Sequence, residues 1–308
     1  MKKIILTAAV ALCTVGLFAQ SAAPSGNSGL QSKKGEMYLP ESGDWAISFE
    51  ATPFLNYLGN FFTSSPTMNQ APVAGFLTSN MTIVGKYFVD EQTAYRGIVR
   101  IGFGSTSWTH LTAQDITTPT NPPAPTVNDK LSVSSHFIGL GAGMEKRKGK
   151  TRLQGYYGAE LFFWISSGGN DSTMTYGNAQ DITNFPGGAN TYNFASASEG
   201  PTLSRTTSSK PGSIFGLSLQ GFIGFEYFFM PKISVGAEYT WGINFWSQGQ
   251  GSNTTEAVYT LIGAAGPSVN TVTTHTGGGS HFGVDTGVNS IFGNASSGSA
   301  ALNITFHF

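Results

Sequence analysis

A serine and a histidine form the pair of side chains with the clearest catalytic potential. Ser134 and His136 are two positions apart, so in a β-strand they share one face. Acyl-transfer enzymes pair a serine with an imidazole base, but they also need an acid that orients the ring. We expect no Asp or Glu on that face of the neighbouring strands. The sequence therefore predicts that the chain is not an enzyme.

The remaining histidines and several aspartates show no spacing typical of a metal site. These residues are His110, His275, His281, His307, Asp171, Asp181 and Asp285. The single cysteine, Cys13, lies in the apolar N-terminal stretch, which excludes disulfides and thiol chemistry once that stretch is removed. We expect no catalytic residue, no metal and no cofactor.

A second group of side chains with functional potential consists of charged residues that alternate with apolar ones. In residues 153–163, for example, Leu153, Tyr157 and Leu161 share one face, while Gln154 and Glu160 lie on the other. A period of two over such a length is typical of a β-strand. Seven other segments repeat the pattern, and their charges fall on the polar face.

This alternation predicts a network of charges that point into the lumen of a β-barrel. Its expected members are Glu50, Lys86, Arg96, Arg100, Glu145, Arg152, Glu160, Glu226 and Glu238. Opposite charges in a narrow interior must pair, because an unpaired buried charge is costly. The main interpretation is a filled lumen whose ion pairs fix the strand register, since eight strands leave room for little beyond side chains. A narrow gated pore is the alternative.

The composition agrees with a barrel in a membrane. The 308 residues include 40 glycines, 13% are aromatic, and only 11% are charged, against about 25% in typical globular domains. The mean hydropathy is nevertheless −0.05. No apolar stretch after Ala19 approaches the roughly 20 residues of a membrane-spanning helix. A chain that crosses lipid without such helices must close its backbone hydrogen bonds in a barrel.

The N-terminus predicts export. Lys2 and Lys3 precede an apolar stretch, and residues 17–19 resemble a signal-peptidase site. We predict a signal peptide over residues 1–19, a flexible periplasmic leader over 20–43 and a transmembrane β-barrel over 44–308. Removal of Lys2 and Lys3 lowers the basic count from 16 to 14 against 17 acidic residues, a net charge of −3. This balance favours no nucleic-acid partner.

The connections predict an antiparallel up-and-down barrel of about eight strands. Short connections at 89–92, 146–150 and 230–232 alternate with long polar ones at 59–75, 109–130, 167–212 and 248–280, as in bacterial outer-membrane barrels. Ten strands, with an extra hairpin inside 167–212, are the alternative. Residues 281–292 alternate weakly and fit either the outer half of the last strand or a hairpin at the rim.

The last strand resembles the C-terminal signal of outer-membrane proteins, which ends in Phe after alternating apolar residues. The matching positions are Leu302, Ile304, Phe306 and Phe308. The opening GDWAISF at 43–49 and PFLNYLG at 53–59 resemble small outer-membrane barrels of the Bacteroidota, of the OmpA-like type without a periplasmic domain. The resemblance implies recognition by the barrel-assembly machinery and periplasmic chaperones, and contact with outer-membrane lipid and lipopolysaccharide.

These inferences lead to one expected function and two alternatives. We expect a monomer in the cell outer membrane, with both termini periplasmic and long extracellular loops that serve a structural or surface-interaction role. The first alternative is a narrow, porin-like pore for small solutes or ions. The second is a hydrolase that modifies lipid A, because some barrel lipases that deacylate lipopolysaccharide carry a similar serine and histidine pair.

Overall fold

The computed structural model describes residues 30–51, 82–115, 125–182, 187–260, 265–285 and 300–308. The predicted signal peptide, the first part of the predicted leader and the predicted connection at 59–75 lie outside these residues. Within the described part of the chain, no helix has the length and apolar character needed to cross a membrane.

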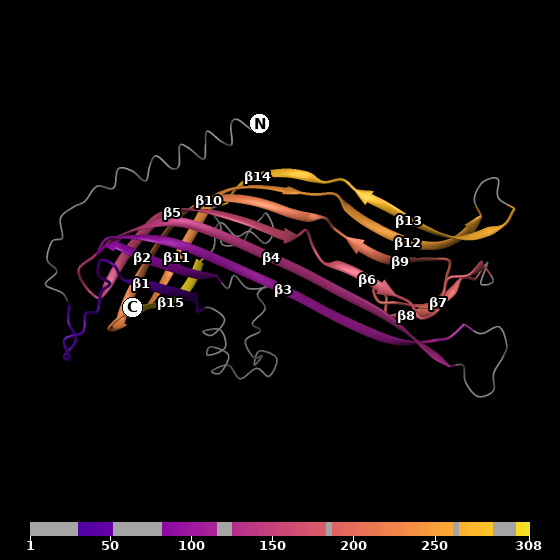
Figure 1. Cartoon of the computed structure of the whole chain (residues 1–308), viewed down its shortest axis with the longest axis horizontal. Helices are drawn as coiled ribbons and strands as arrows, with labels where there is room; N and C mark the ends of the chain where they lie inside the picture. Colours follow the sequence, from indigo (N-terminus) through magenta and orange to yellow (C-terminus); the bar gives the residue numbers. More distant parts are fainter. Residues whose placement is uncertain (1–29, 52–81, 116–124, 183–186, 261–264, 286–299) are drawn as a thin grey trace.

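Eight antiparallel strands close into a barrel, which confirms the predicted fold and strand number (Figure 1). Each strand pairs with its neighbour in chain order, and the last strand pairs with the first. The strands are β1 (Trp45–Glu50), β2 (Ile83–Asp90), β3 (Thr93–Ala113), β4 (Thr126–Lys148), β5 (Leu153–Ser167), β10 (Ser213–Met230), β11 (Ile233–Gln248) and β15 (Ala300–His307).

The barrel sheet continues at one end into a long extension. There β3 pairs with β4, and β4 pairs with β6 (Asp171–Thr175). The sheet then continues through β9 (Ser204–Lys210) and β12 (Gly251–Thr260) to β13 (Pro267–Thr276). A separate hairpin of β7 (Ala189–Asn193) and β8 (Ser198–Thr202) lies at the far end of this extension (Figure 1). A hairpin inside 167–212 thus exists, but it adds no strand to the barrel.

The prediction of polar loops at 109–130, 167–212 and 248–280 is therefore wrong for most of the residues described there. Their serines and threonines resemble loop composition, but Thr is β-branched and favours strands. Paired hydroxyls also link neighbouring strands, as between Thr254 and Thr273 at 3.1 Å. β14 (Gly279–Asp285) pairs with β11 beside β15, so it is the outer part of the last strand, the first of the two predicted interpretations.

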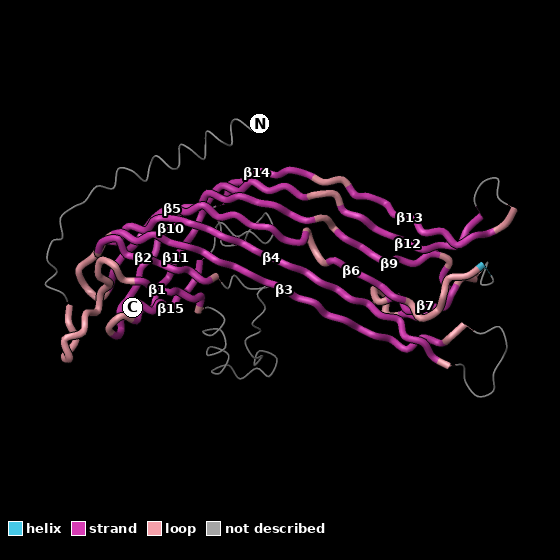
Figure 2. Tube along the Cα trace, viewed as in Figure 1, coloured by secondary structure: helices cyan, strands magenta, loops and turns pink. Residues whose placement is uncertain are grey.

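Four long strands are interrupted at the boundary between barrel and extension, whereas β3 and β4 are continuous. The interruptions at 168–170, 211–212, 249–250 and 277–278 lie side by side across the sheet (Figure 2). They are rich in glycine. Gly212 has a φ of +81°, which disfavours other residues, and a Cβ on Gly168 would lie 2.1 Å from the Gly212 carbonyl oxygen. We call these four breaks the glycine line.

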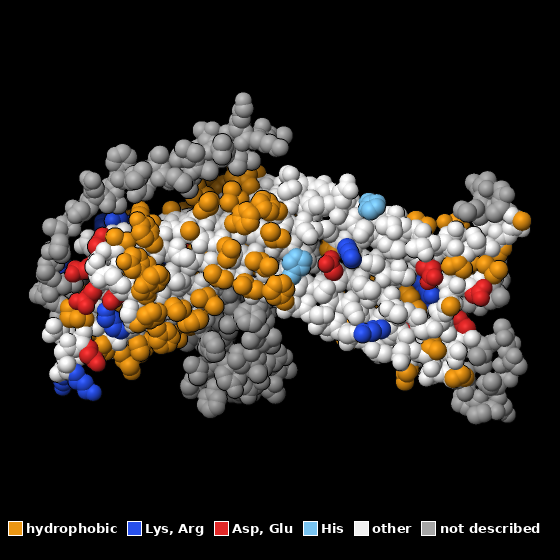
Figure 3. Space-filling view, in the orientation of Figure 1, with side chains coloured by type: hydrophobic (Ala, Val, Ile, Leu, Met, Phe, Trp, Pro, Cys, Tyr) orange, Lys and Arg blue, Asp and Glu red, His pale blue; other side chains and the backbone are white. Residues whose placement is uncertain are grey.

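The barrel has an apolar exterior and a polar interior. On β5, the outward Leu153, Tyr157 and Ile165 are 54%, 47% and 43% exposed, whereas the inward Gln154 and Glu160 are buried. Figure 3 shows hydrophobic side chains gathered over the barrel, while the extension is mostly neutral and polar. The usual arrangement of a water-soluble domain is reversed.

Large inward rings are accommodated by glycines on the neighbouring strand. The register places Trp164 opposite Gly216, Phe222 opposite Gly158 and Tyr156 opposite Gly224. Each glycine provides the space that its facing ring occupies.

We expect Gly158→Ala to destabilise the barrel by about 1–3 kcal/mol, because overpacking forces neighbours apart. The added Cβ would lie 2.0 Å from the carbonyl oxygen of Met144 and 2.4 Å from the Phe222 ring. Urea unfolding in detergent, followed by tryptophan fluorescence, measures the change. Gly97→Ala is the control, since nothing lies within 4 Å of its Cβ position. Equal stabilities of the two variants would contradict this account.

Candidate functional site in the barrel interior

A fully buried carboxylate, Glu145 of β4, lies at the centre of the interior charges. The Nζ of Lys86 on β2 lies 3.1 Å from its Oε2, and Nη1 of Arg96 on β3 lies 3.5 Å from the same atom. Arg147, two residues along β4, places Nη1 3.4 Å from Oε1. Three cations from three neighbouring strands therefore surround one carboxylate.

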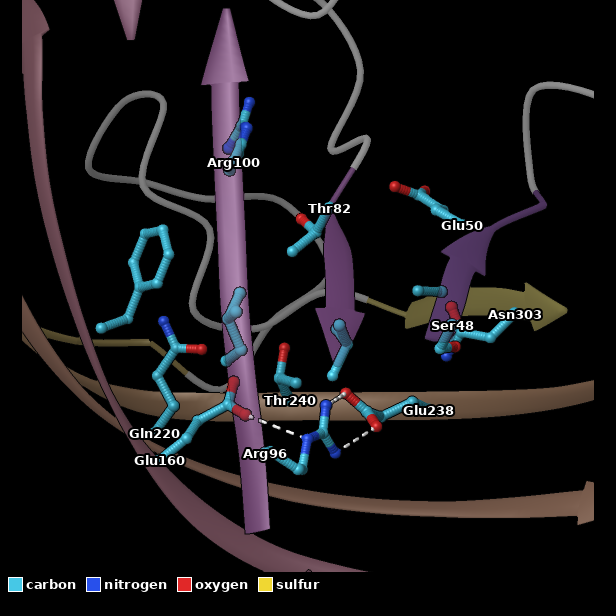
Figure 4. A pocket seen from close by; sticks show the side chains of 14 residues that line it. Ser48, Glu50, Thr82, Arg96, Arg100, Glu160, Gln220, Glu238, Thr240 and Asn303 are labelled. Carbon is cyan, nitrogen blue, oxygen red and sulfur yellow. Dashed lines mark hydrogen bonds and ion pairs between the residues drawn. The ribbon is translucent and has the colours of Figure 1, made fainter. Parts of the chain in front are cut away.

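Arg96 extends the network across the lumen. Its Nη1 and Nη2 donate to the two carboxylate oxygens of Glu238 on β11, at 2.7 and 3.1 Å. Its Nε lies 3.6 Å from Glu160 of β5, so that Figure 4 shows Arg96 between two carboxylates. The guanidinium also stacks 3.9 Å from the centre of the Phe222 ring. A paired, two-pronged contact of this kind fixes orientation as well as charge.

A second carboxylate, Glu226 of β10, organises the end of the barrel near the C-terminus. Arg147 and Ser234 donate to it, and Nε2 of His307 lies 3.2 Å away. The rings of Phe88 and Phe228 flank His307, with centroid distances of 5.6 and 5.1 Å. Both phenylalanines are fully buried. Ion pairs and rings together fill this end of the lumen.

A cavity of about 100 Å³ adjoins the network (Figure 4). Glu50, Arg100 and Asn303 line it. The guanidinium of Arg100 lies 4.4 Å from the centre of the Phe137 ring, which packs with Phe162 and Trp164 in a hydrophobic cluster. Within the described residues, aromatic side chains thus lie on both sides of the ionic layer.

The structure joins six of the nine predicted lumen residues in one connected network: Lys86, Arg96, Glu145, Glu160, Glu226 and Glu238. Glu50 and Arg100 lie beside this network, in the lining of the adjoining cavity. Arg152 does not follow the prediction. It precedes β5, and its guanidinium lies over the ring of Tyr38 at 3.9 Å.

Sequence reasoning missed Arg147 and His307 as members of this network. Residues 146–150 were predicted as a turn, but β4 extends to Lys148. Arg147 then shares the inward face with Glu145, two residues before it, and that spacing was the available signal. His307 was considered as a possible metal ligand, although it alternates with the apolar Phe306 and Phe308 of the last strand.

The structure corrects the prediction that no acid faces Ser134. β6 pairs with β4 and places Asp171 directly opposite Ser134, on the same face as His136. The error follows from the prediction of a loop at 167–212, which hid this strand. Among the described residues, however, no hydrogen bond or ion pair joins the side chains of these three residues, and no group of three metal-ligating side chains occurs.

The predicted assembly residues Leu302, Phe306 and Phe308 are exposed on the outer surface, and Ile304 shares their face. The backbones of Phe308 and Trp45 exchange two hydrogen bonds, of 2.8 and 2.9 Å, so the last residue lies beside the first strand.

Comparison of the chain with protein-family models found no match. Comparison with curated proteins also found none.

Proposed function

We propose that the chain is an integral outer-membrane protein whose barrel spans the lipid and whose extension forms a surface for interaction outside the cell. The observation that carries this proposal is the reversed distribution of side chains, with apolar residues outside the barrel and paired charges inside it. In water this arrangement would expose the apolar surface and bury the charges. In lipid, the outward apolar residues contact the acyl chains, and the interior position keeps the charges away from them.

The height of the apolar surface fits a bilayer. The outward apolar residues of β5 extend from Leu153 to Ile165. Twelve residue steps of about 3.3 Å, tilted by about 45°, span ~28 Å along the barrel axis. The apolar band of outer-membrane barrels is about 25 Å tall.

The orientation of the chain follows from the lengths of its connections. The start of β1, the C-terminus and the short turns lie at one end of the barrel, and the extension projects from the other end (Figure 1). In bacterial barrels short turns face the periplasm. We therefore infer periplasmic termini, an external extension, contact with lipopolysaccharide and lipid, and assembly through the barrel-assembly machinery. We also infer a monomer without a catalytic role.

Cysteine labelling tests both the location and the orientation. Thr271→Cys on β13 and Lys150→Cys in the turn after β4 each introduce an exposed thiol. With a maleimide that cannot cross membranes, we expect Thr271→Cys to be labelled in intact cells and Lys150→Cys only after lysis. Recovery of both proteins in the soluble periplasmic fraction would refute the proposal.

The filled lumen favours a structural barrel over the alternative of a pore. Paired charges and buried rings occupy the interior that eight strands enclose. In planar lipid bilayers, we expect the purified barrel to give no discrete conductance steps at any voltage tested. Reproducible steps would instead support a narrow pore.

A further inference from the structure

A cleft of about 760 Å³ lies at the far end of the extension, between the β7–β8 hairpin and strands β4, β6, β9 and β12. The register of β3 with β4 is regular throughout, so Leu131 in the cleft shares the face of Glu145 in the lumen. The cleft thus lies on the face of the extension that continues the interior of the barrel.

The walls of the cleft are held in place by a buried aspartate. Asp129 of β4 accepts hydrogen bonds from the backbone N–H groups of Gly177 and Tyr192, at 2.8 and 2.7 Å, and from Thr112 at 3.0 Å. Its side chain is fully buried. These bonds join the hairpin to the sheet, so the cleft does not need to form when a ligand arrives.

Aromatic rings provide part of the lining. Tyr192 stacks on His110 with centroids 3.6 Å apart, and Phe194 meets Tyr192 edge to face at 5.0 Å. Tyr176 carries the guanidinium of Arg205 at 4.5 Å from its ring centre. Ring faces offer apolar contact to the C–H groups of a flat, otherwise polar ligand.

The charged residues of the lining already have partners. The guanidinium of Arg205 binds Glu256 at 2.8 and 3.0 Å. Glu199 accepts hydrogen bonds from the N–H of Ala113 and from Asn190, and these bonds hold its pKa below the usual value of a carboxyl group. Most of the other lining residues are neutral Ser, Thr, Asn and Gly, so the cleft has little free charge for an ionic ligand.

One buried polar atom of the lining has no hydrogen-bond partner among the described residues. The Oδ1 of Asn253 on β12 is buried and accepts no hydrogen bond from the residues that the structure describes. A buried acceptor without a donor is unfavourable, because it has lost its hydrogen bond to water. Asn253 itself is only partly buried, so rotation of its amide turns this acceptor toward the cleft, where a ligand hydroxyl can donate to it.

From these features we propose that the cleft binds a neutral saccharide, with its rings against Tyr192 and Phe194 and a hydroxyl donated to Asn253. A saccharide combines C–H faces with many hydroxyl groups and no charge, which matches rings, neutral polar side chains and an unsatisfied acceptor. This inference rests on the proposed surface role and specifies its ligand.

Isothermal titration calorimetry on the full-length protein in detergent tests the proposal. The probes are neutral hexasaccharides of glucose, mannose, galactose and N-acetylglucosamine, with a hexamer of galacturonate and an uncharged hexapeptide for comparison. We expect at least one neutral hexasaccharide to bind. Absence of binding by all four, or tighter binding of the galacturonate hexamer or of the peptide, would overturn the proposal.

Two variants locate the binding. We expect Phe194→Ala and Asn253→Ala each to raise the Kd about tenfold, which corresponds to about 1.4 kcal/mol. Tyr259→Ala removes an aromatic ring and Asn270→Ala removes an asparagine from the extension outside the cleft, and each should change the Kd less than twofold. Equal effects of the cleft variants and these controls would place the ligand elsewhere.

The saccharide-binding experiment and the test of membrane location are independent of each other. Binding in detergent does not depend on where the cell places the protein, and cysteine labelling does not depend on any ligand. A labelled extension without saccharide binding would overturn the cleft proposal alone.

Discussion

Glu145→Gln is expected to destabilise the barrel by about 3–5 kcal/mol, because removal of one partner leaves a buried charge uncompensated. Glu145 is the one ion-pair partner found for Lys86 within the described residues, whereas Arg96 keeps Glu238 and Arg147 keeps Glu226. Lys86 is 3% exposed and cannot recover hydration without distortion of the strands. Urea unfolding of the barrel in lipid vesicles measures the loss.

A double variant keeps this prediction testable if the single variant fails to fold. Lys86→Met together with Glu145→Gln removes the stranded charge and keeps a similar side-chain length. We expect the double variant to be more stable than Glu145→Gln alone. If the double variant is the less stable of the two, or if the single substitution changes stability by under about 0.5 kcal/mol, the ion pair is not the cause.

Leu161→Arg is expected to cost about 2–4 kcal/mol in lipid vesicles, because it places a charge on the outer face near the middle of the apolar band. Leu161 on β5 is 37% exposed. Val272 of β13 in the extension is 40% exposed, so it offers a matched position outside the proposed membrane.

The comparison of the two substitutions separates lipid from water around the barrel. If lipid surrounds β5 and water surrounds β13, Val272→Arg should change the free energy of unfolding by less than about 0.5 kcal/mol. If water surrounds both strands, the two arginine variants should have similar small effects. That second result would contradict a barrel embedded in the membrane.

The barrel could be predicted from the sequence because the outer face of its strands is apolar and the inner face carries the charges. The outward positions of the barrel strands are apolar, as on β5 from Leu153 to Ile165, and the charged side chains fall on the opposite face. This period identifies strands and faces without any knowledge of their partners. The short turns then set the order of the strands.

The ion pairs could not be predicted because they depend on how the sheet closes. Arg96 and Glu238 are 142 residues apart, and they meet across the lumen rather than along one strand pair. The positions at which strands begin and end also determine which residues belong to the ion-pair network. Arg147 joins the network because β4 continues two residues past Glu145, and Arg152 is excluded because β5 begins after it.

The extension was missed because its strands are polar on both faces. In β13, residues 271–276 are all exposed, so no apolar period distinguishes this strand from a loop. Its stability depends on backbone pairing with β12 over ten residue pairs. The same error hid the cross-strand pair of Ser134 and Asp171.

The glycine line has a mechanical consequence for the extension. On one side of the sheet, β3 and β4 cross the line as unbroken strands joined by 21 residue pairs. On the other side, four strands are interrupted at the line. Single backbone hydrogen bonds remain there, from Gly168 N–H to the Gly212 oxygen and from Gly249 N–H to the Ser213 oxygen, both at 2.8 Å. The bending stiffness of the sheet is therefore unequal. Bending at the free edge of β13 strains only these few bonds, whereas bending at the edge of β3 strains a continuous ladder.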